Sequence, residues 1–141
     1  MTSTIIPTLR YHDAERMIAW LSEAFGFTRH LVVEDGAGGI AHAQLTLGNS
    51  MIMLGSVRDN EFGALLSPDS QDGTADGVGS VTQSAYIIVE DVDGLCDKAK
   101  SAGAEIVMGP RAEDYGGRGF SCRDPEGQLW NFGSYDPWSS T

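Results

Sequence analysis

The sequence predicts a single α+β domain in which one βαβββ pattern occurs twice. Asp13 is a helix-start signal in the first half of the chain, and Asp91 is its counterpart in the second half. Each is followed by an apolar stripe at helical spacing and then by a glycine, Gly26 or Gly103, that ends the helix. The two copies are offset by about 78 residues. A nearly constant offset between several signals is hard to obtain by chance, so we expect two similar modules.

The 141 residues fit one compact domain. We assign the whole chain, 1–141, to this domain, with module one over 1–57, a flexible linker over 58–80 and module two over 81–141. The linker assignment rests on composition, because aspartate, glycine and serine dominate this stretch and the only apolar interruption is short. A long loop of this kind in a small domain is usually mobile or functional. We therefore expect early proteolytic cleavage between Asp59 and Gly79.

Module one should contain a strand, a helix and three further strands. The helix begins after Asp13 and carries apolar side chains on one face. Short polar and glycine-containing turns separate the strands that follow it. The five expected elements are Ile5–Tyr11, Ala14–Phe25, Phe27–Glu34, Ile40–Leu47 and Ser50–Ser56.

Module two should repeat this order. Ser84–Val89 is an apolar strand, and the helical stripe that follows ends before Gly103. Cys96 lies on this stripe, so we expect it in the core. The module closes with a β-hairpin whose strands, 119–123 and 128–133, flank the turn Asp124–Gly127, where a proline presets φ and a glycine accepts a positive φ.

Charge and composition exclude several classes of partner. The formal net charge of −11 opposes the approach of nucleic acid or of an anionic membrane. No apolar run is long enough for a membrane helix, and the N-terminus lacks the basic flank of a signal peptide. Cys96 and Cys122 fit neither a metal knuckle nor a redox motif. We therefore expect a cytoplasmic protein with two free thiols.

The stretch Tyr115–Tyr135 resembles the C-terminal hairpin of the vicinal oxygen chelate superfamily, which includes glyoxalases, extradiol dioxygenases and bleomycin-resistance proteins. Members often carry Tyr-Gly-x-Arg, a polar strand, Asp-Pro-x-Gly-Asn/Gln and an apolar strand. Here these motifs are Tyr115–Arg118 and Asp124–Gln128. The resemblance implies that the modules curl into an incomplete barrel around a cleft, with each helix packed outside. It also implies a homodimer, because bleomycin-resistance proteins build their pockets across one.

Metal-dependent members of that superfamily place His, Gln or Glu on the first and last strand of each module. The matching positions here are Ile6, Met53, Ser84 and Asn131. Apolar, thioether, hydroxyl and amide groups are poor ligands for zinc, nickel or iron. The resemblance therefore implies a type without a metal site, and we expect no metal and no cofactor.

We expect a small organic ligand in the cleft, and a function in drug or metabolite sequestration. The alternative is a glyoxalase-type lyase or isomerase that uses either an unconventional metal site or acid–base residues such as His42 or Glu90. The sequence does not identify its catalytic residues. With Asn131 facing the cleft, strand alternation turns Trp130 and Phe132 toward the helix. The candidate ligand-binding residues are Tyr115, Arg118, Phe120, Asn131, His42 and Met53.

Arg118 allows two interpretations. A guanidinium presents a planar fork of donors that suits a carboxylate. The carboxylate belongs either to the ligand or to the protein, where Glu113, Asp114 and Asp124 are close in sequence. The glycines before Arg118 permit unusual backbone conformations, which suggests that this loop positions something.

Overall fold

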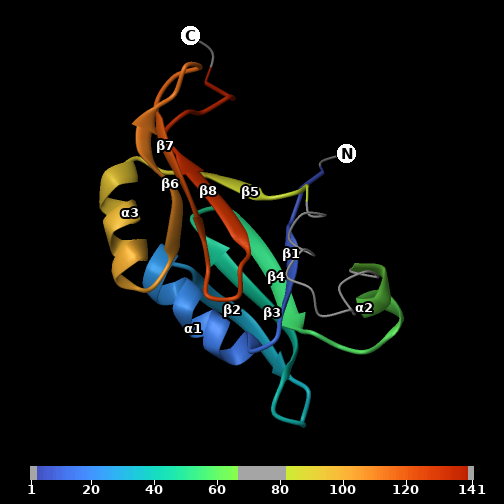
Figure 1. Cartoon of the computed structure of the whole chain (residues 1–141). Helices are drawn as coiled ribbons and strands as arrows, with labels where there is room; N and C mark the ends of the chain where they lie inside the picture. The colour runs from blue at the N-terminus through green and yellow to red at the C-terminus, as the bar shows by residue number, and fades with distance from the viewer. Residues whose placement is uncertain (1–2, 67–81, 140–141) are drawn as a thin grey trace.

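The computed structural model describes residues 3–66 and 82–139, which form eight strands and three helices in two four-stranded sheets (Figure 1). The N-terminal sheet has the order β1 (Thr8–Tyr11), β4 (Ser50–Ser56), β3 (Ile40–Leu47), β2 (Thr28–Glu34). The C-terminal sheet has the order β5 (Ala85–Ile88), β8 (Leu129–Gly133), β7 (Arg118–Arg123), β6 (Glu105–Ala112). In each sheet the first strand pairs in parallel with the last strand of its module, and the other pairs are antiparallel.

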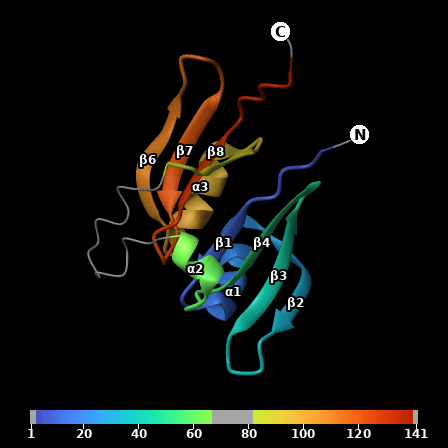
Figure 2. The same cartoon turned by 90° about the vertical axis from the view of Figure 1, so that its right-hand side faces the viewer.

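The two modules have the same topology, so the predicted βαβββ repeat is confirmed. Helix α1 (Ala14–Phe25) covers one face of the N-terminal sheet, and α3 (Val92–Ser101) covers one face of the C-terminal sheet. The two helices also contact each other. Figure 2 shows the sheets as separate layers that are not closed into a barrel. Each sheet therefore keeps a face that no helix of its own module covers.

The helix signals act as expected. The Asp13 carboxylate accepts a hydrogen bond from the N–H of Arg16 at 3.2 Å, and the Asp91 carboxylate accepts one from Gly94 at 3.0 Å. Both satisfy N–H groups that a helix start leaves without partners. At the end of α1, Gly26 has φ of 88° and donates its N–H to the last turn, which is a conformation that favours glycine.

The core is continuous between the modules. The buried face of α1 ends in Phe25, whose ring lies 4.7 Å from that of Phe132 and 5.4 Å from that of Trp130. Phe132 and Trp130 are both 1% exposed. The predicted alternation along β8 is therefore correct, since these two rings face the helices. At the other end of the core, Trp20 of α1 donates its indole N–H to the Ala102 carbonyl at 2.7 Å.

A buried carboxylate also joins the modules. Asp124, only 4% exposed, accepts a hydrogen bond from the hydroxyl of Tyr11 at 2.6 Å and one from the indole of Trp130 at 3.0 Å. The carboxylate of Glu126 accepts the backbone N–H groups of residues 12–13 at 2.6 and 2.7 Å. The turn of the last hairpin is thereby fixed to the junction between β1 and α1.

Two expectations need correction. The first strand begins at Thr8 and not at Ile5, whose side chain is 92% exposed. Pro7 precedes the strand because it has no N–H to donate, although its carbonyl accepts the N–H of Met53 at 3.0 Å. The predicted linker also contains a short helix, α2 (Glu61–Leu66), which composition did not indicate.

The rest of the predicted linker, 67–80, lies outside the described residues, and its mobility stays a prediction. No helix in the described ranges 3–66 and 82–139 is long and apolar enough to cross a membrane.

Candidate functional site

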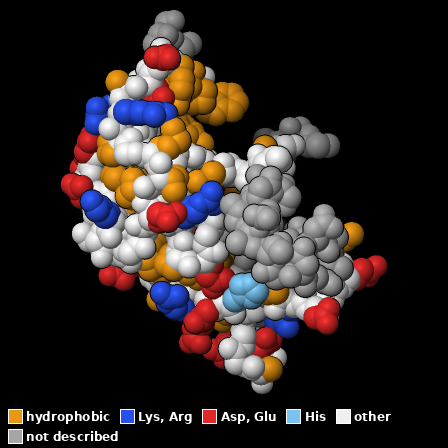
Figure 3. Space-filling view, in the orientation of Figure 1, with side chains coloured by type: hydrophobic (Ala, Val, Ile, Leu, Met, Phe, Trp, Pro, Cys, Tyr) orange, Lys and Arg blue, Asp and Glu red, His pale blue; other side chains and the backbone are white. Residues whose placement is uncertain are grey.

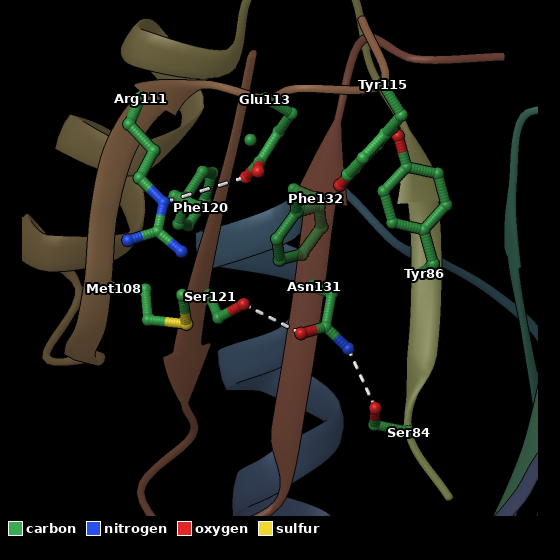
Figure 4. A pocket seen from close by; sticks show the side chains of 11 residues that line it. Ser84, Tyr86, Met108, Arg111, Glu113, Tyr115, Phe120, Ser121, Asn131 and Phe132 are labelled. Carbon is green, nitrogen blue, oxygen red and sulfur yellow. Dashed lines mark hydrogen bonds and ion pairs between the residues drawn. The ribbon is translucent and has the colours of Figure 1, made fainter. Parts of the chain in front are cut away.

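A pocket of about 400 Å³ lies on the face of the C-terminal sheet that α3 leaves uncovered (Figure 4). Side chains from β5 to β8 and from the loop before β7 surround it. In the space-filling view, hydrophobic side chains gather over the upper half of the molecule, where these strands lie (Figure 3). The lining residues are Ser84, Tyr86, Met108, Arg111, Glu113, Tyr115, Gly119, Phe120, Ser121, Asn131 and Phe132.

The floor of the pocket is one row of residues that crosses all four strands. In register from β5 to β6, the row is Tyr86, Asn131, Ser121 and Met108. Residues paired in this way project from the same face of a sheet. The sheet register therefore gathers one aromatic ring, one amide, one hydroxyl and one thioether at the pocket floor.

Hydrogen bonds fix the orientation of the amide in this row. The Asn131 Nδ2 group donates to the Ala85 carbonyl at 3.0 Å and to Ser84 Oγ at 2.8 Å, and Asn131 Oδ1 accepts from Ser121 Oγ at 2.7 Å. A flipped amide would place its oxygen against the Ala85 carbonyl oxygen, so only this orientation satisfies both sides. The hydroxyl hydrogen of Ser84 then remains available to a ligand.

Arg111 and Glu113 form the charged rim of the pocket. Both come from β6 and the loop that follows it, and their closest charged atoms, Nε and Oε1, are 3.8 Å apart. This is an ion pair that is too long for a hydrogen bond. The Arg111 side chain is 57% exposed and the Glu113 side chain 22%. In Figure 4 the guanidinium extends over the pocket toward Met108 and Ser121.

The opposite wall consists of Tyr115 and of Tyr86 at the β5 end of the floor row, and Tyr135 contacts both of them without lining the pocket. Tyr86 donates its hydroxyl hydrogen to the Tyr135 carbonyl at 2.7 Å, and its ring lies against Gly133, where a Cβ atom would come within 2.5 Å of the hydroxyl. Burial is the main factor that raises the pKa of Tyr86, and the neighbouring phenols add to it. The Tyr115 ring meets that of Tyr135 edge to face, with centroids 4.9 Å apart. The wall is therefore aromatic.

A second, larger hollow of about 1060 Å³ lies between the modules. Its walls include apolar side chains from both, such as Phe27, Leu47, Ile52 and Ile87. It lacks the hydrogen-bonded polar row of the first pocket. Ligand sites combine apolar walls with a few convergent polar groups, so the pocket on the C-terminal sheet is the better candidate.

The structure brings together three of the six predicted ligand-binding residues. Tyr115, Phe120 and Asn131 line the pocket. Phe120 is only 3% exposed and stacks on Phe132 with ring centroids 5.0 Å apart, so most of its surface belongs to the core.

His42 and Met53 lie on the other sheet. Met53 belongs to a row that matches the pocket floor strand by strand: Thr8, Met53, Gln44 and Leu31. His42 lies beside this row, with its Nε2 atom 3.0 Å from Nε2 of Gln44. Within one chain, these two residues do not line the pocket that contains Asn131.

Arg118 does not line the pocket either. Its guanidinium donates two hydrogen bonds, of 3.0 and 2.9 Å, to the carboxylate of Asp93 in α3. The protein therefore supplies the carboxylate, but from a helix 25 positions earlier and not from the three residues near Arg118 in sequence. These hydrogen bonds lower the pKa of Asp93 and raise that of Arg118.

The guanidinium that reaches the pocket is that of Arg111, which sequence reasoning missed. The signal was weak because β6 contains Gly109 and Pro110 and its pairing with β7 shifts register twice. Simple alternation along the strand therefore does not indicate which side chains share a face.

The pocket residues do not fit a divalent metal. The superfamily resemblance implies metal ligands at the positions of Ser84 and Asn131. Here the Asn131 side-chain oxygen already accepts a hydrogen bond from Ser121. In the ranges that the structure describes, no group of three or more His, Cys, Asp or Glu side chains is arranged to hold an ion. The lining residues include one carboxylate, that of Glu113, which lies beside the Arg111 guanidinium, and the remaining hydroxyl, amide and thioether groups bind zinc or iron weakly.

Comparisons with known proteins agree with this fold. The sequence model of the glyoxalase/bleomycin resistance protein/dioxygenase superfamily matches residues 5–132. The crystal structure of TioX from Micromonospora sp. ML1 is similar, with 28% identity, a TM-score of 0.70, and coverage of 94% of this chain and 98% of that one. A search of curated proteins gave no match.

Two further solved structures show the same fold at lower identity. UcmS2 has 17% identity and a TM-score of 0.72, and the alignment covers 96% of this chain and all of the other (100%). A glyoxalase/bleomycin resistance protein/dioxygenase family enzyme from Burkholderia phytofirmans PsJN has 19% identity and a TM-score of 0.64, with 89% and 93% of the two chains covered.

Proposed function

Because the chain belongs to the glyoxalase/bleomycin resistance protein/dioxygenase superfamily, we propose that it binds a small organic molecule in the pocket on the C-terminal sheet. Its role is to sequester a drug or a metabolite, and it needs no metal ion to do so. The hydrogen-bonded row of Ser121, Asn131 and Ser84 is the observation that carries this proposal. The superfamily resemblance implies metal ligands at the positions of Ser84 and Asn131, and here these two side chains are hydrogen-bonded to each other.

The pocket has the composition of a binding site. Its volume of about 400 Å³ suits a small organic molecule. Apolar contact comes from Met108 and from the tyrosine wall, while the hydroxyl of Ser84 and the charges of the rim can orient a ligand. Sequestration requires only such complementarity.

The lyase or isomerase alternative receives less support. Its acid–base candidates were His42 and Glu90, and within one chain neither lines the pocket. A general acid or base must come within hydrogen-bond reach of the reacting atom, directly or through one water molecule.

We propose that the protein works as a homodimer. The uncovered face of the N-terminal sheet carries His42 and Met53 together with Leu31 and Val33, which are 45% and 44% exposed. A second copy could place this face against the pocket of the first copy and complete its wall. Light scattering on the purified protein tests this, and a mass of one chain at all concentrations would contradict it.

We place the protein in the cytoplasm, without a nucleic-acid or membrane partner. Both cysteines are free and buried, which supports a reducing compartment. The net charge of −11 supports the absence of a nucleic-acid or anionic-membrane partner.

A ligand screen with a matched pair of variants tests the binding function. Val107 and Met108 are adjacent on β6 and equally exposed, at 42%, but only Met108 lines the pocket. We expect compounds that raise the melting temperature of the wild type to lose this effect in Met108→Asp and to keep it in Val107→Asp. Equal losses in both variants would place the binding elsewhere.

Elemental analysis tests metal independence. We expect less than one equivalent of zinc, nickel or iron per chain after expression in metal-supplemented medium. One equivalent that is lost on chelation, together with an activity on a glyoxalase-type substrate, would replace our proposal with the lyase or isomerase.

A further inference from the structure

We propose that Arg111 anchors the carboxylate of a planar aromatic acid in this pocket. The inference rests on the proposed function and adds to it a class of ligand and a residue that selects for it. Its experiment therefore separates binding in general from recognition of the carboxylate.

The guanidinium of Arg111 is free to take a ligand. In the described part of the chain it makes no hydrogen bond, and its one ion pair, with Glu113, spans 3.8 Å. Arg118 and Arg58, by contrast, donate hydrogen bonds of 2.9 to 3.0 Å to Asp93 and Asp35. The donors of Arg111 thus remain open, and its guanidinium extends over the pocket (Figure 4).

The geometry of the Arg111 guanidinium favours a carboxylate over other ligand groups. A guanidinium presents parallel N–H donors that match the two oxygens of a planar carboxylate. The loose contact with Glu113 holds the guanidinium near the rim without occupying its donors. The ligand carboxylate can therefore bind without breaking a short salt bridge.

The rest of the pocket indicates an aromatic body. Met108 lies on the floor beneath the guanidinium, and Tyr86 and Tyr115 form the far wall. Thioether and aromatic groups pack well against the face and edge of a flat ring. Ser84, whose hydroxyl hydrogen is uncommitted, can donate to an acceptor at the end of the ligand that lies away from Arg111.

A cationic ligand is the main competitor, because Glu113 also lines the pocket. The exposed fractions of the two side chains argue against a cationic ligand, since Glu113 is 22% exposed and Arg111 is 57% exposed. An entering ligand meets the guanidinium first.

The experiment compares naphthoate with naphthamide, which has the same shape without the charge. Binding is followed by two-dimensional NMR of isotope-labelled full-length protein, so that the shifted signals identify the pocket. We expect wild-type protein to bind naphthoate about tenfold more tightly than naphthamide, as for a hydrogen-bonded charge pair. The shifts should be largest at Ser121, Asn131 and Tyr86.

Two variants that each remove one positive charge test whether Arg111 causes the preference for naphthoate. Arg111→Met removes the guanidinium and keeps an unbranched apolar stem, and we expect it to abolish the preference for naphthoate while naphthamide binding is unchanged. Arg118→Met removes the same charge outside the pocket and should keep the preference. Glu113→Gln removes the competing carboxylate and should strengthen naphthoate binding severalfold.

The outcomes separate the two proposals. Equal affinities of naphthoate and naphthamide in the wild type, with shifts in the pocket, would overturn the role of Arg111 and leave the binding function intact. An equal loss in Arg111→Met and Arg118→Met, or tighter binding of naphthylmethylamine than of naphthoate, would also overturn it. The absence of pocket shifts with all three probes would contradict both the inference and the proposed pocket.

Discussion

The Tyr11 hydroxyl lies 2.6 Å from Oδ2 of Asp124, across 113 positions of the sequence. Tyr11 is fully buried at the end of β1 in module one, and Asp124 begins the hairpin turn of module two. The same carboxylate oxygen accepts the indole N–H of Trp130, and the other oxygen accepts two backbone N–H groups of the turn. A buried carboxylate with four donors joins the two halves of the domain.

Loss of this hydroxyl should weaken the whole domain. We expect Tyr11→Phe to lower the free energy of unfolding by about 1.5 to 3 kcal/mol, the usual effect of a buried hydrogen bond to a charged group. Urea denaturation measures it. Tyr115→Phe is the control, because that side chain is 59% exposed and should change stability by less than about 0.5 kcal/mol. Equal effects of the two substitutions would show that the hydrogen bond to Asp124 adds little.

Alkaline pH should destabilise the protein through Cys122 and Tyr11. Burial raises the pKa of Cys122 to about 12, and burial followed by the charge of Asp124 raises that of Tyr11 above its usual value. A raised pKa in the folded state means that the unfolded state loses its proton first. The stabilisation is complete below pH of about 9 and falls as pH rises toward about 12, by at most about 1.4 kcal/mol per pH unit for each group.

Urea denaturation between pH 8 and 11 measures this slope, and Cys122→Ala should make it shallower. At pH 8 we expect neither Cys96 nor Cys122 to react with a thiol reagent in the native protein, since both are buried, and both to react in urea. Rapid labelling of native Cys122 would contradict its burial.

The pair of Arg118 and Asp93 should stabilise the fold only slightly, because both side chains are largely exposed, at 47% and 59%. We expect Arg118→Ala and Asp93→Asn to lower the melting temperature by similar small amounts and the double variant to add nothing. The hydrogen bonds lower the pKa of Asp93 in the folded state, so the contribution is present above its unfolded value and disappears as pH falls through the folded value. A difference in stability between wild type and Arg118→Ala that does not shrink as pH falls below the unfolded-state pKa of Asp93 would contradict this pairing.

Gly133 should be essential for the tyrosine wall. A Cβ atom there would meet the hydroxyl of Tyr86 at 2.5 Å and its ring at 2.9 Å. We expect Gly133→Ala to displace Tyr86 from Tyr135 and to weaken ligand binding, which NMR titration measures. Gly109→Ala is the control, because a Cβ atom on Gly109 meets nothing within 4 Å. Unchanged binding in Gly133→Ala would show that the ligand does not use this wall.

The repeat and the direction of the β8 side chains were predictable from local signals. Helix caps such as Asp13, stop signals such as Gly26 and the alternation around Asn131 each depend on a few neighbouring residues. These signals agree with one another in both modules. For this reason the sequence was sufficient to predict the fold class.

The partners of charged residues were not predictable in this way. Arg118 binds Asp93 because α3 packs beside β7, and that contact depends on the whole module. Arg111 reaches the pocket because two register shifts in β6 change which side chains face it. Both facts follow from tertiary packing, which the spacing of residues does not encode.

The hydrogen bond between Tyr11 and Asp124 has a consequence for folding during synthesis. A ribosome releases Tyr11 long before it has added Asp124, so module one emerges with this hydroxyl still without its carboxylate partner. The core of module one must then remain incomplete until the last hairpin is translated and folds against it. We therefore expect folding to be completed only late in synthesis, when the final hairpin packs against module one.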